Sequence, residues 1–184
     1  MKNILFNILL LSFFSCSNSD QFIIEKGRVG HLNKKTVIKD IANIFKNDSL
    51  VVNLAKDKGE NDQRFLNAID EYQIFEKGGK KLLTITPIKS NDSLSKLKSI
   101  EVFDNRFITK KGISLYSPYK DINATYNISI INTLSSAHID IDEINATMQI
   151  RKEEIGIDKS NRNKIRKDMI PDLAKIEHFT IWFN

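Results

Sequence analysis

The stretch SLSKLKSIEVF at residues 93–103 recurs near the end of the chain as DLAKIEHFTIWF at residues 172–183. Two further segments recur in the same order: FIIEKG at 22–27 returns as FITKKG at 107–112, and TVIKDI at 36–41 returns as SPYKDI at 117–122. The partners are 79, 85 and 81 residues apart, respectively. Ordered matches of this kind predict two tandem units, residues 22–105 and 106–184. The alternative is that short apolar patterns resemble one another without any duplication.

Each predicted unit opens with a strand and a glycine turn, and a short helix follows. In the first unit, apolar residues between positions 38 and 45 fall on one helical face, and Thr36 is the expected N-cap. In the second unit, Ser117 is the expected cap and Pro118 takes the first helical position. The two units therefore begin with the same order of elements.

Later segments alternate between polar and apolar residues, which predicts strands with one buried face. Residues 71–77 and 80–88 flank Gly78-Gly79, a typical hairpin signal. Further strands are expected at 50–54, 144–150 and 179–183, and a short helix at roughly 160–168. The predicted fold class is α+β, mainly antiparallel sheet with one short helix packed on it per unit.

The first sixteen residues have the pattern of a bacterial lipoprotein signal. Met1-Lys2 is positively charged, residues 4–14 are almost wholly apolar, and Ser15 precedes Cys16, the only cysteine. The apolar run is shorter than the roughly 20 residues that cross a bilayer, so we expect a signal peptide. Residues 1–15 would be removed, Cys16 would carry the lipid, and 16–21 would form a polar, flexible tether. The alternative is that Cys16 is an unused thiol in a cleaved segment.

Bulk composition narrows the class of protein. The chain has 184 residues, a net charge of +5, 41% hydrophobic and 28% charged residues, which is typical of a globular protein. Its basic residues are not interleaved with aromatic ones, so no nucleic-acid partner is expected. With one cysteine the chain has no intramolecular disulfide, and its stability must come from buried apolar area.

Few residues suggest catalysis, and neither a metal ion nor a cofactor is expected. The histidines at 31, 138 and 178 lack the spacing of a zinc protease. The chain has no glycine-rich phosphate loop and no GxSxG elbow. His138, Asp140 and Asp142 alternate with apolar residues and would share one strand face. They could bind a hard cation or act as acid and base, or simply form a solvated face.

The last strand offers a second candidate surface. His178 and Trp182 would share one of its faces, where they could line a partner site or pack against a neighbouring element. We therefore interpret the chain as a binding or structural module rather than an enzyme. One alternative is an envelope hydrolase that uses His138, Asp140 and Asp142. Another is a carrier of an apolar ligand held between sheet and helices.

The run SIEVFDNRFITKKGISLYSPYKDI at 99–122, with EKGRVGHL at 25–32 and the closing IWFN, resembles the RpoE-regulated lipoprotein family of Gram-negative envelopes. The resemblance implies a small exported lipoprotein without an established biochemical role, and it supplies no catalytic residues. The richness in Asn, Lys and Ile, with a Cys-Ser-Asn-Ser start, is similar to lipoproteins of Bacteroidota. Because Ser17 rather than an aspartate follows Cys16, we expect the outer membrane, facing the periplasm, and an envelope protein as partner.

Overall fold

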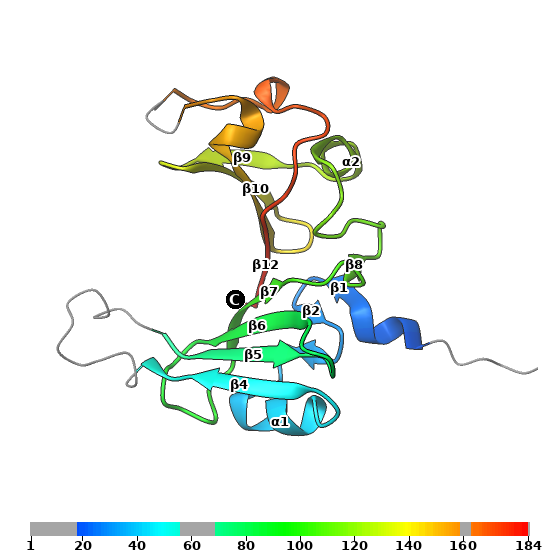
Figure 1. Ribbon diagram of the computed structural model, residues 1–184, viewed down its shortest axis with the longest axis vertical. Helices are drawn as coiled ribbons and strands as arrows, with labels where there is room; N and C mark the ends of the chain where they lie inside the picture. Colours follow the sequence, from blue (N-terminus) through cyan, green and yellow to red (C-terminus); the bar gives the residue numbers. More distant parts are fainter. Residues whose placement is uncertain (1–17, 56–68, 159–162, 184) are drawn as a thin grey trace, which may run out of the picture.

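The computed structural model describes residues 18–55, 69–158 and 163–183. Its main feature is one antiparallel sheet of eight strands in the order β4-β5-β6-β7-β12-β11-β10-β9 (Figure 1). The strands are β4 (Ser49–Asn53), β5 (Glu71–Phe75), β6 (Lys81–Pro87), β7 (Leu97–Val102), β9 (Ser129–Asn132), β10 (Ser136–Ile141), β11 (Ala146–Arg151) and β12 (His178–Trp182). Each half of the chain supplies four consecutive strands, and the two sets meet where β7 pairs with β12.

A second, smaller sheet packs on one face of the large one. Its order is β3-β2-β1-β8, formed by β1 (Ile23–Glu25), β2 (Arg28–Val29), β3 (Leu32–Asn33) and β8 (Ile108–Thr109). β1 and β8 run parallel, with Ile23 opposite Ile108. Just before these strands, the rings of Phe22 and Phe107 meet edge to face with centroids 5.1 Å apart. This sheet therefore joins the opening segments of the two halves of the chain.

The helices are short. They are η1 (Asn18–Phe22), η2 (Ile38–Asp40), α1 (Ile41–Ile44), α2 (Tyr119–Thr125), η5 (Lys152–Ile155) and η6 (Lys167–Met169). The expected α+β class, mostly antiparallel sheet with few short helices, is confirmed. The short helix expected at roughly 160–168 is wrong for residues 163–166, which are not helical, while residues 167 and 168 belong to η6.

The expected N-caps also need correction. The Thr36 hydroxyl accepts a hydrogen bond from the backbone N–H of Asn33 at 3.1 Å, and the Ser117 hydroxyl accepts one from Ser114 at 3.0 Å. Both hydroxyls therefore close the turn before the helix, and α2 begins after Pro118 rather than at it. Short polar side chains often satisfy a local backbone donor in this way.

Each helical segment is tied to the chain that leads into the last strand of its half. The backbone N–H of Ile38 donates to the Ser95 carbonyl oxygen at 3.0 Å, ahead of β7. The N–H of Tyr119 donates to the Ala174 carbonyl oxygen at 3.2 Å, ahead of β12. These bonds hold the helices on the same face of the large sheet as the small one.

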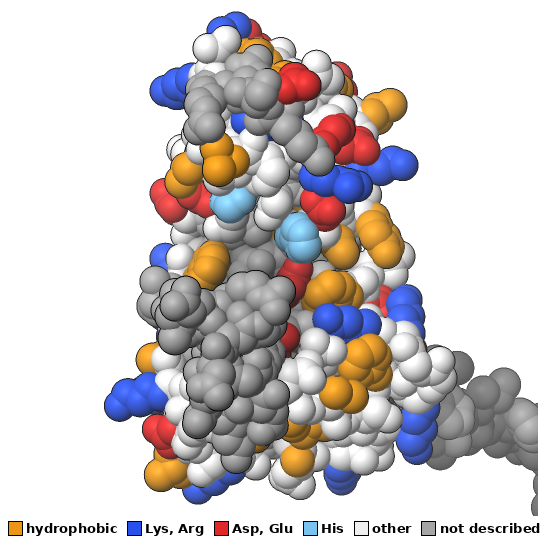
Figure 2. Space-filling model, turned by 60° about the vertical axis from the view of Figure 1, so that its left-hand side comes forward, with side chains coloured by type: hydrophobic (Ala, Val, Ile, Leu, Met, Phe, Trp, Pro, Cys, Tyr) orange, Lys and Arg blue, Asp and Glu red, His pale blue; other side chains and the backbone are white. Residues whose placement is uncertain are grey.

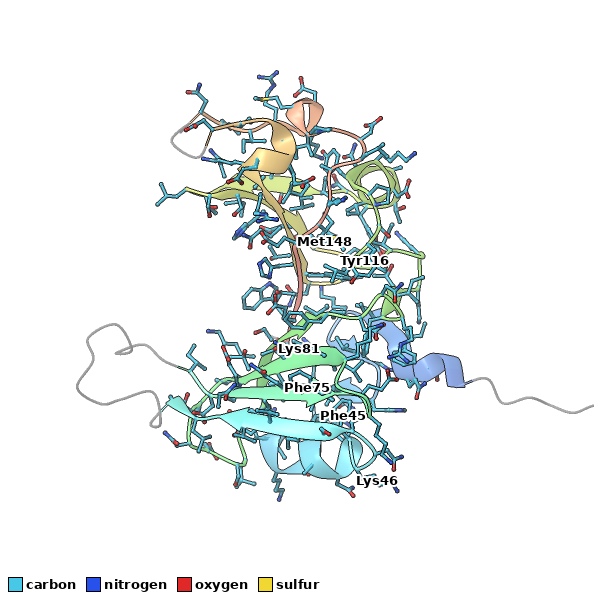
Figure 3. The ribbon with its side chains drawn as sticks, viewed as in Figure 1. Phe45, Lys46, Phe75, Lys81, Tyr116 and Met148 are labelled. Carbon is cyan, nitrogen blue, oxygen red and sulfur yellow. The ribbon has the colours of Figure 1, made fainter. Side chains whose placement is uncertain are left out.

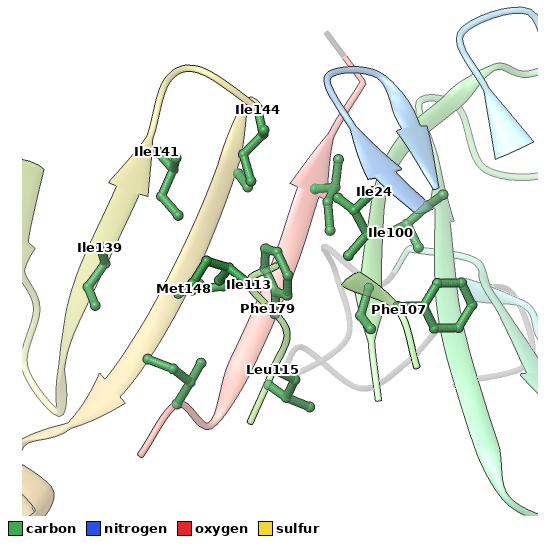
Figure 4. Close-up of a cluster of buried hydrophobic side chains, with 14 of the residues drawn as sticks. Ile24, Ile100, Phe107, Ile113, Leu115, Ile139, Ile141, Ile144, Met148 and Phe179 are labelled. Carbon is green, nitrogen blue, oxygen red and sulfur yellow. The ribbon is translucent and has the colours of Figure 1, made fainter. Parts of the chain in front are cut away.

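One apolar core fills the space between the large sheet and the elements that cover it. Ile24 of β1, Ile100 of β7 and Phe179 of β12 are completely buried in it (Figure 4). Along β11, Met148 and Ile150 point into the core, while Thr147 and Gln149 face away from it. The large sheet thus has one covered face and one opposite face.

The buried carboxylate of Asp104 stabilises the turn between β7 and β8. Asp104 is fully buried and accepts hydrogen bonds from the Arg106 backbone N–H at 2.9 Å and from its Nη2 at 2.7 Å, while Lys80 Nζ lies 3.0 Å away. Burial alone would raise the pKa of Asp104, but these donors lower it to about 2. Arg106 Nη1 also pairs with Glu76 at 2.8 Å. The carboxylate is therefore a structural anion at neutral pH.

Candidate functional site: the outer face of the large sheet

The face of the large sheet opposite the core, here called the outer face, carries most of the polar chemistry predicted from the sequence. Its side chains alternate with core residues along the strands, as the two-residue period of a strand requires. On four consecutive strands these residues are Ser99 and Glu101 (β7), His178, Thr180 and Trp182 (β12), Thr147 and Gln149 (β11), and His138 and Asp140 (β10).

One row of this face crosses the whole sheet. Its members stand directly opposite one another on neighbouring strands: Val51, Gln73, Thr84, Glu101, Thr180, Thr147, Asp140 and Ser129. Adjacent strands are about 4.8 Å apart, so the row is on the order of 30 Å long. Only Val51 in it is apolar, and the hydroxyl of Thr84 is buried without a hydrogen-bond partner in the described structure. We call this set the polar row.

Hydrogen bonds fix the part of the polar row on β10 and β11. The indole Nε1–H of Trp182 donates to Thr147 Oγ1 at 3.0 Å. Thr147 Oγ1 in turn donates to Asp140 Oδ1 at 2.9 Å. This chain of donors and acceptors spans three strands, and it orients the half-buried indole ring on the outer face.

A histidine–carboxylate pair lies beside the centre of the row. His178 Nδ1 hydrogen-bonds to Glu101 Oε1, and the two side chains are 43% and 26% exposed. A carboxylate that binds Nδ1 fixes the orientation of the imidazole ring, so Nε2 points away from Glu101. Nε2 lies 3.9 Å from Glu177, which also pairs with Arg151 at 3.4 Å. Figure 2 shows two histidine side chains near one another on this side, beside acidic side chains.

The carboxylates of the polar row are too far apart to form the acid and base pair of a glycosidase. Asp140 and Glu101 are three strands apart, so their Cα atoms are separated by roughly 14 Å. Paired carboxyl groups of glycosidases lie about 5–10 Å apart. No serine or threonine hydroxyl of the described chain hydrogen-bonds to His178, as an activated nucleophile would. Among the described residues no group of three His, Cys, Asp or Glu side chains could hold a metal ion.

The structure brings together two sets of residues that the sequence treated separately. His138 and Asp140 share the outer face with His178 and Trp182. Asp142 does not join them, because β10 ends at Ile141 and Asp142 is exposed in the following turn. The residue that links the sets, Thr147, was missed, although its place in the alternating β11 segment was a usable signal. Cys16, the expected lipid site, lies outside the described residues.

One hollow lies away from the outer face. It measures about 450 Å³ and is lined mainly by Leu115, Tyr116, Pro118, Leu173 and Ile176. Tyr116, labelled in Figure 3, is 67% exposed, and Leu173 is 70% exposed, so the hollow is open to solvent. The space between sheet and helices, where an apolar ligand was considered, is filled by the core.

Comparison with known proteins informs the fold. No family profile and no curated protein matches this sequence. A solved structure that is similar is the crystal structure of the uncharacterized protein yfeY from Escherichia coli, with a TM-score of 0.50 and 14% identity over 86% of this chain and 98% of that chain. The likeness shows a shared fold. None of the described helices is long and apolar enough to span a membrane.

Proposed function

We propose that this chain is a lipid-anchored envelope protein that binds a protein partner through its outer face. The observation that carries the binding role is the polar row, which crosses all eight strands. Its solvent-accessible hydroxyl, amide and carboxylate groups can exchange water for a partner's hydrogen bonds.

The anchor is proposed at Cys16, after removal of residues 1–15. Its support is the charged start, the short apolar run and the small residue before the single cysteine. Several acyl chains make membrane attachment stable, whereas a single chain does not. We place the protein at the outer membrane, facing the periplasm. The fold shared with the Escherichia coli protein is compatible with membership of the RpoE-regulated lipoprotein family, in a Bacteroidota species.

We also propose that the chain consists of two tandem units, residues 22–105 and 106–184. The turn bonds from Asn33 to Thr36 and from Ser114 to Ser117 recur 81 residues apart, the spacing of the repeated sequence. Glu101 and Thr180, which occupy matching positions in the repeated segments, lie opposite each other where β7 pairs with β12. A pseudo-twofold axis between them would place the centre of the polar row at the junction of the units.

The charge of the outer face indicates the kind of partner. Asp140 and Glu101 are its carboxylates on β10 and β7, in a chain whose net charge is +5. Trp182 adds a large aromatic surface, which is common at protein interfaces. A partner with basic and polar side chains along an extended surface would complement the row.

Site-specific photo-crosslinking in intact cells tests this role. A photoreactive residue at Gln149, beside the row, should give a discrete adduct with an envelope protein. The same residue at Lys120, exposed on α2, should not. Asp140→Asn together with Glu101→Gln should reduce the Gln149 adduct at least several-fold without changing the amount of folded protein. Equal adducts from both positions, or an adduct indifferent to the two carboxylates, would contradict the proposal.

The anchor is tested separately by mass measurement and fractionation. The mature N-terminus should be Cys16 with added acyl mass, and Cys16→Ser should move the protein from the membrane to the soluble fraction. A Cys16→Ser protein that remains in the membrane fraction would refute the anchor while leaving the binding test intact.

A further inference from the structure

The described fold begins very close to the proposed anchor. Only Ser17 separates Cys16 from Asn18, the first residue of η1. An extended chain spans at most about 3.6 Å per residue, so η1 begins within about 7 Å of the anchored residue. η1 is fastened to the fold through Phe22, whose ring centroid lies 4.7 Å from the Arg106 guanidinium carbon. An anchor at Cys16 would therefore hold the folded protein against the membrane.

The surface around η1 is basic. The small sheet buries Ile24 and Val29 on one side and turns Glu25 and Arg28 outward on the other. Cations of its strands and turns gather here: Lys26, Arg28, Lys34, Lys35, Lys110 and Lys111. The carboxylates that pair with them are Asp20, Glu25 and Glu143, while Asp48 and Glu76 line a separate hollow beside Gln21 and Phe22 of η1. We call this surface the basic face.

A hollow in the basic face is lined by three of these lysines. It measures about 280 Å³, and its charged lining consists of Lys26, Lys110 and Lys111 together with Glu25 and Glu143. Lys110 Nζ lies 3.2 Å from Glu25, and Lys111 Nζ lies 2.7 Å from Glu143. Lys26 is exposed and has no ion-pair partner among the described residues. The hollow thus offers one uncompensated ammonium group and two that can be shared with an added anion.

We propose that the basic face docks on anionic phospholipid, with a headgroup phosphate in the hollow between Lys26, Lys110 and Lys111. This inference rests on the proposed anchor at Cys16, which brings the basic face to the bilayer surface. Charge complementarity supports lipid as the occupant, because each lysine or arginine near an anionic membrane strengthens binding about fivefold. Ile108, 37% exposed on β8, adds an apolar contact at the interface.

Docking in this orientation would direct the outer face away from the bilayer. The small sheet and η1 lie on the covered side of the large sheet, opposite the outer face (Figure 1). A partner could then approach the polar row without displacing lipid. The basic face would then fix the orientation of the protein on the membrane, and the outer face would bind the partner protein.

Lysine acetylation on vesicles tests the docking. The full lipidated protein is inserted into vesicles of phosphatidylcholine alone, or of phosphatidylcholine with about one third phosphatidylglycerol, and acetylation of each lysine is followed by mass spectrometry. Lys26 and Lys110 should react about fivefold more slowly on the anionic vesicles. High salt should abolish this protection, because it screens the attraction. Lys164 and Lys175, exposed outside the basic face, should react equally on both.

Matched charge reversals give the control. Lys26→Glu with Lys110→Glu should remove the protection of the remaining lysines of the basic face, while Lys164→Glu with Lys175→Glu, the same change in net charge, should leave it. Equal reactivity of Lys26 and Lys110 on the two vesicle types, with acyl mass present on Cys16, would overturn the docking and leave the anchor standing. Absence of acyl mass on Cys16 would overturn the anchor and the docking that rests on it.

Discussion

Replacing Asp104 by asparagine removes one negative charge from a fully buried site without changing its size. Arg106 and Lys80 then keep their positive charges but lose the carboxylate that they contact at 2.7 and 3.0 Å. The loss should appear as reduced stability rather than as an altered fold, because the Asn oxygen can still accept the Arg106 backbone N–H.

The size of the effect follows from the pKa. The Asp104 carboxyl has a pKa of about 2 in the folded protein, against the ordinary value of 3.8. One pKa unit corresponds to about 1.4 kcal/mol, so the charged form contributes about 2 kcal/mol at neutral pH. Because the folded pKa is depressed, this contribution is present above about pH 4 and is lost as the pH falls toward 2. At pH 2 about 0.4 kcal/mol should remain.

Urea unfolding followed by the fluorescence of Trp182 measures this difference, in a Cys16→Ser background that keeps the protein in solution. Asp104→Asn should lower the free energy of unfolding by about 2 kcal/mol at pH 7 and by much less at pH 2.5. Asp168→Asn is the matched control, because Asp168 makes a similar paired contact with Arg166 on the exposed surface. A loss at Asp104 that is equally large at both pH values would refute the electrostatic account.

Three further changes test the packing and the outer face. Gly30→Ala should lower the free energy of unfolding by at least about 2 kcal/mol, because a Cβ would lie 2.3 Å from a backbone oxygen and φ is +55°. Gly78→Ala should lower it by about 1 kcal/mol, because φ is +108° but nothing lies within 4 Å of the added Cβ. Urea unfolding measures both variants. Phe179→Ala should cost about 3–5 kcal/mol, since the ring is completely buried, and a loss below 1 kcal/mol would contradict the core described above. Thr147→Val should cost about 1 kcal/mol and shift the emission of Trp182, because the indole N–H loses its acceptor; an unchanged spectrum would show that the bond does not hold the ring.

Local patterns predicted the local structure well. The Gly78-Gly79 pair marks the turn between β5 and β6, and both glycines adopt positive φ, which side chains disfavour. The alternation in β11 also appears as expected, since its apolar residues lie on the core side. These features depend on neighbouring residues alone, so a single sequence contains the information for them.

Features that depend on distant contacts could not be predicted in this way. An opening strand was expected in each half, but the parallel pairing of β1 with β8 was not, because it joins segments about 85 residues apart in the sequence. Asp142 was grouped with Asp140 by spacing, but the strand ends at Ile141, so the third residue leaves the face. Thr147 can link Trp182 to Asp140 only because β11 pairs with both β10 and β12. That strand order is set by contacts across the whole sheet.

The relation between the two proposed surfaces follows from the burial of one sheet face. The helices, the small sheet and η1 all lie on the apolar face of the large sheet, which they cover. The described chain therefore begins on the covered side of the sheet. The opposite face then consists of the residues that alternate with the core, and in the polar row all of these except Val51 are polar. If Cys16 carries a lipid, as proposed, the covered side of the large sheet would face the bilayer and its outer face would point away. A partner protein bound to the polar row would therefore lie on the side away from the membrane.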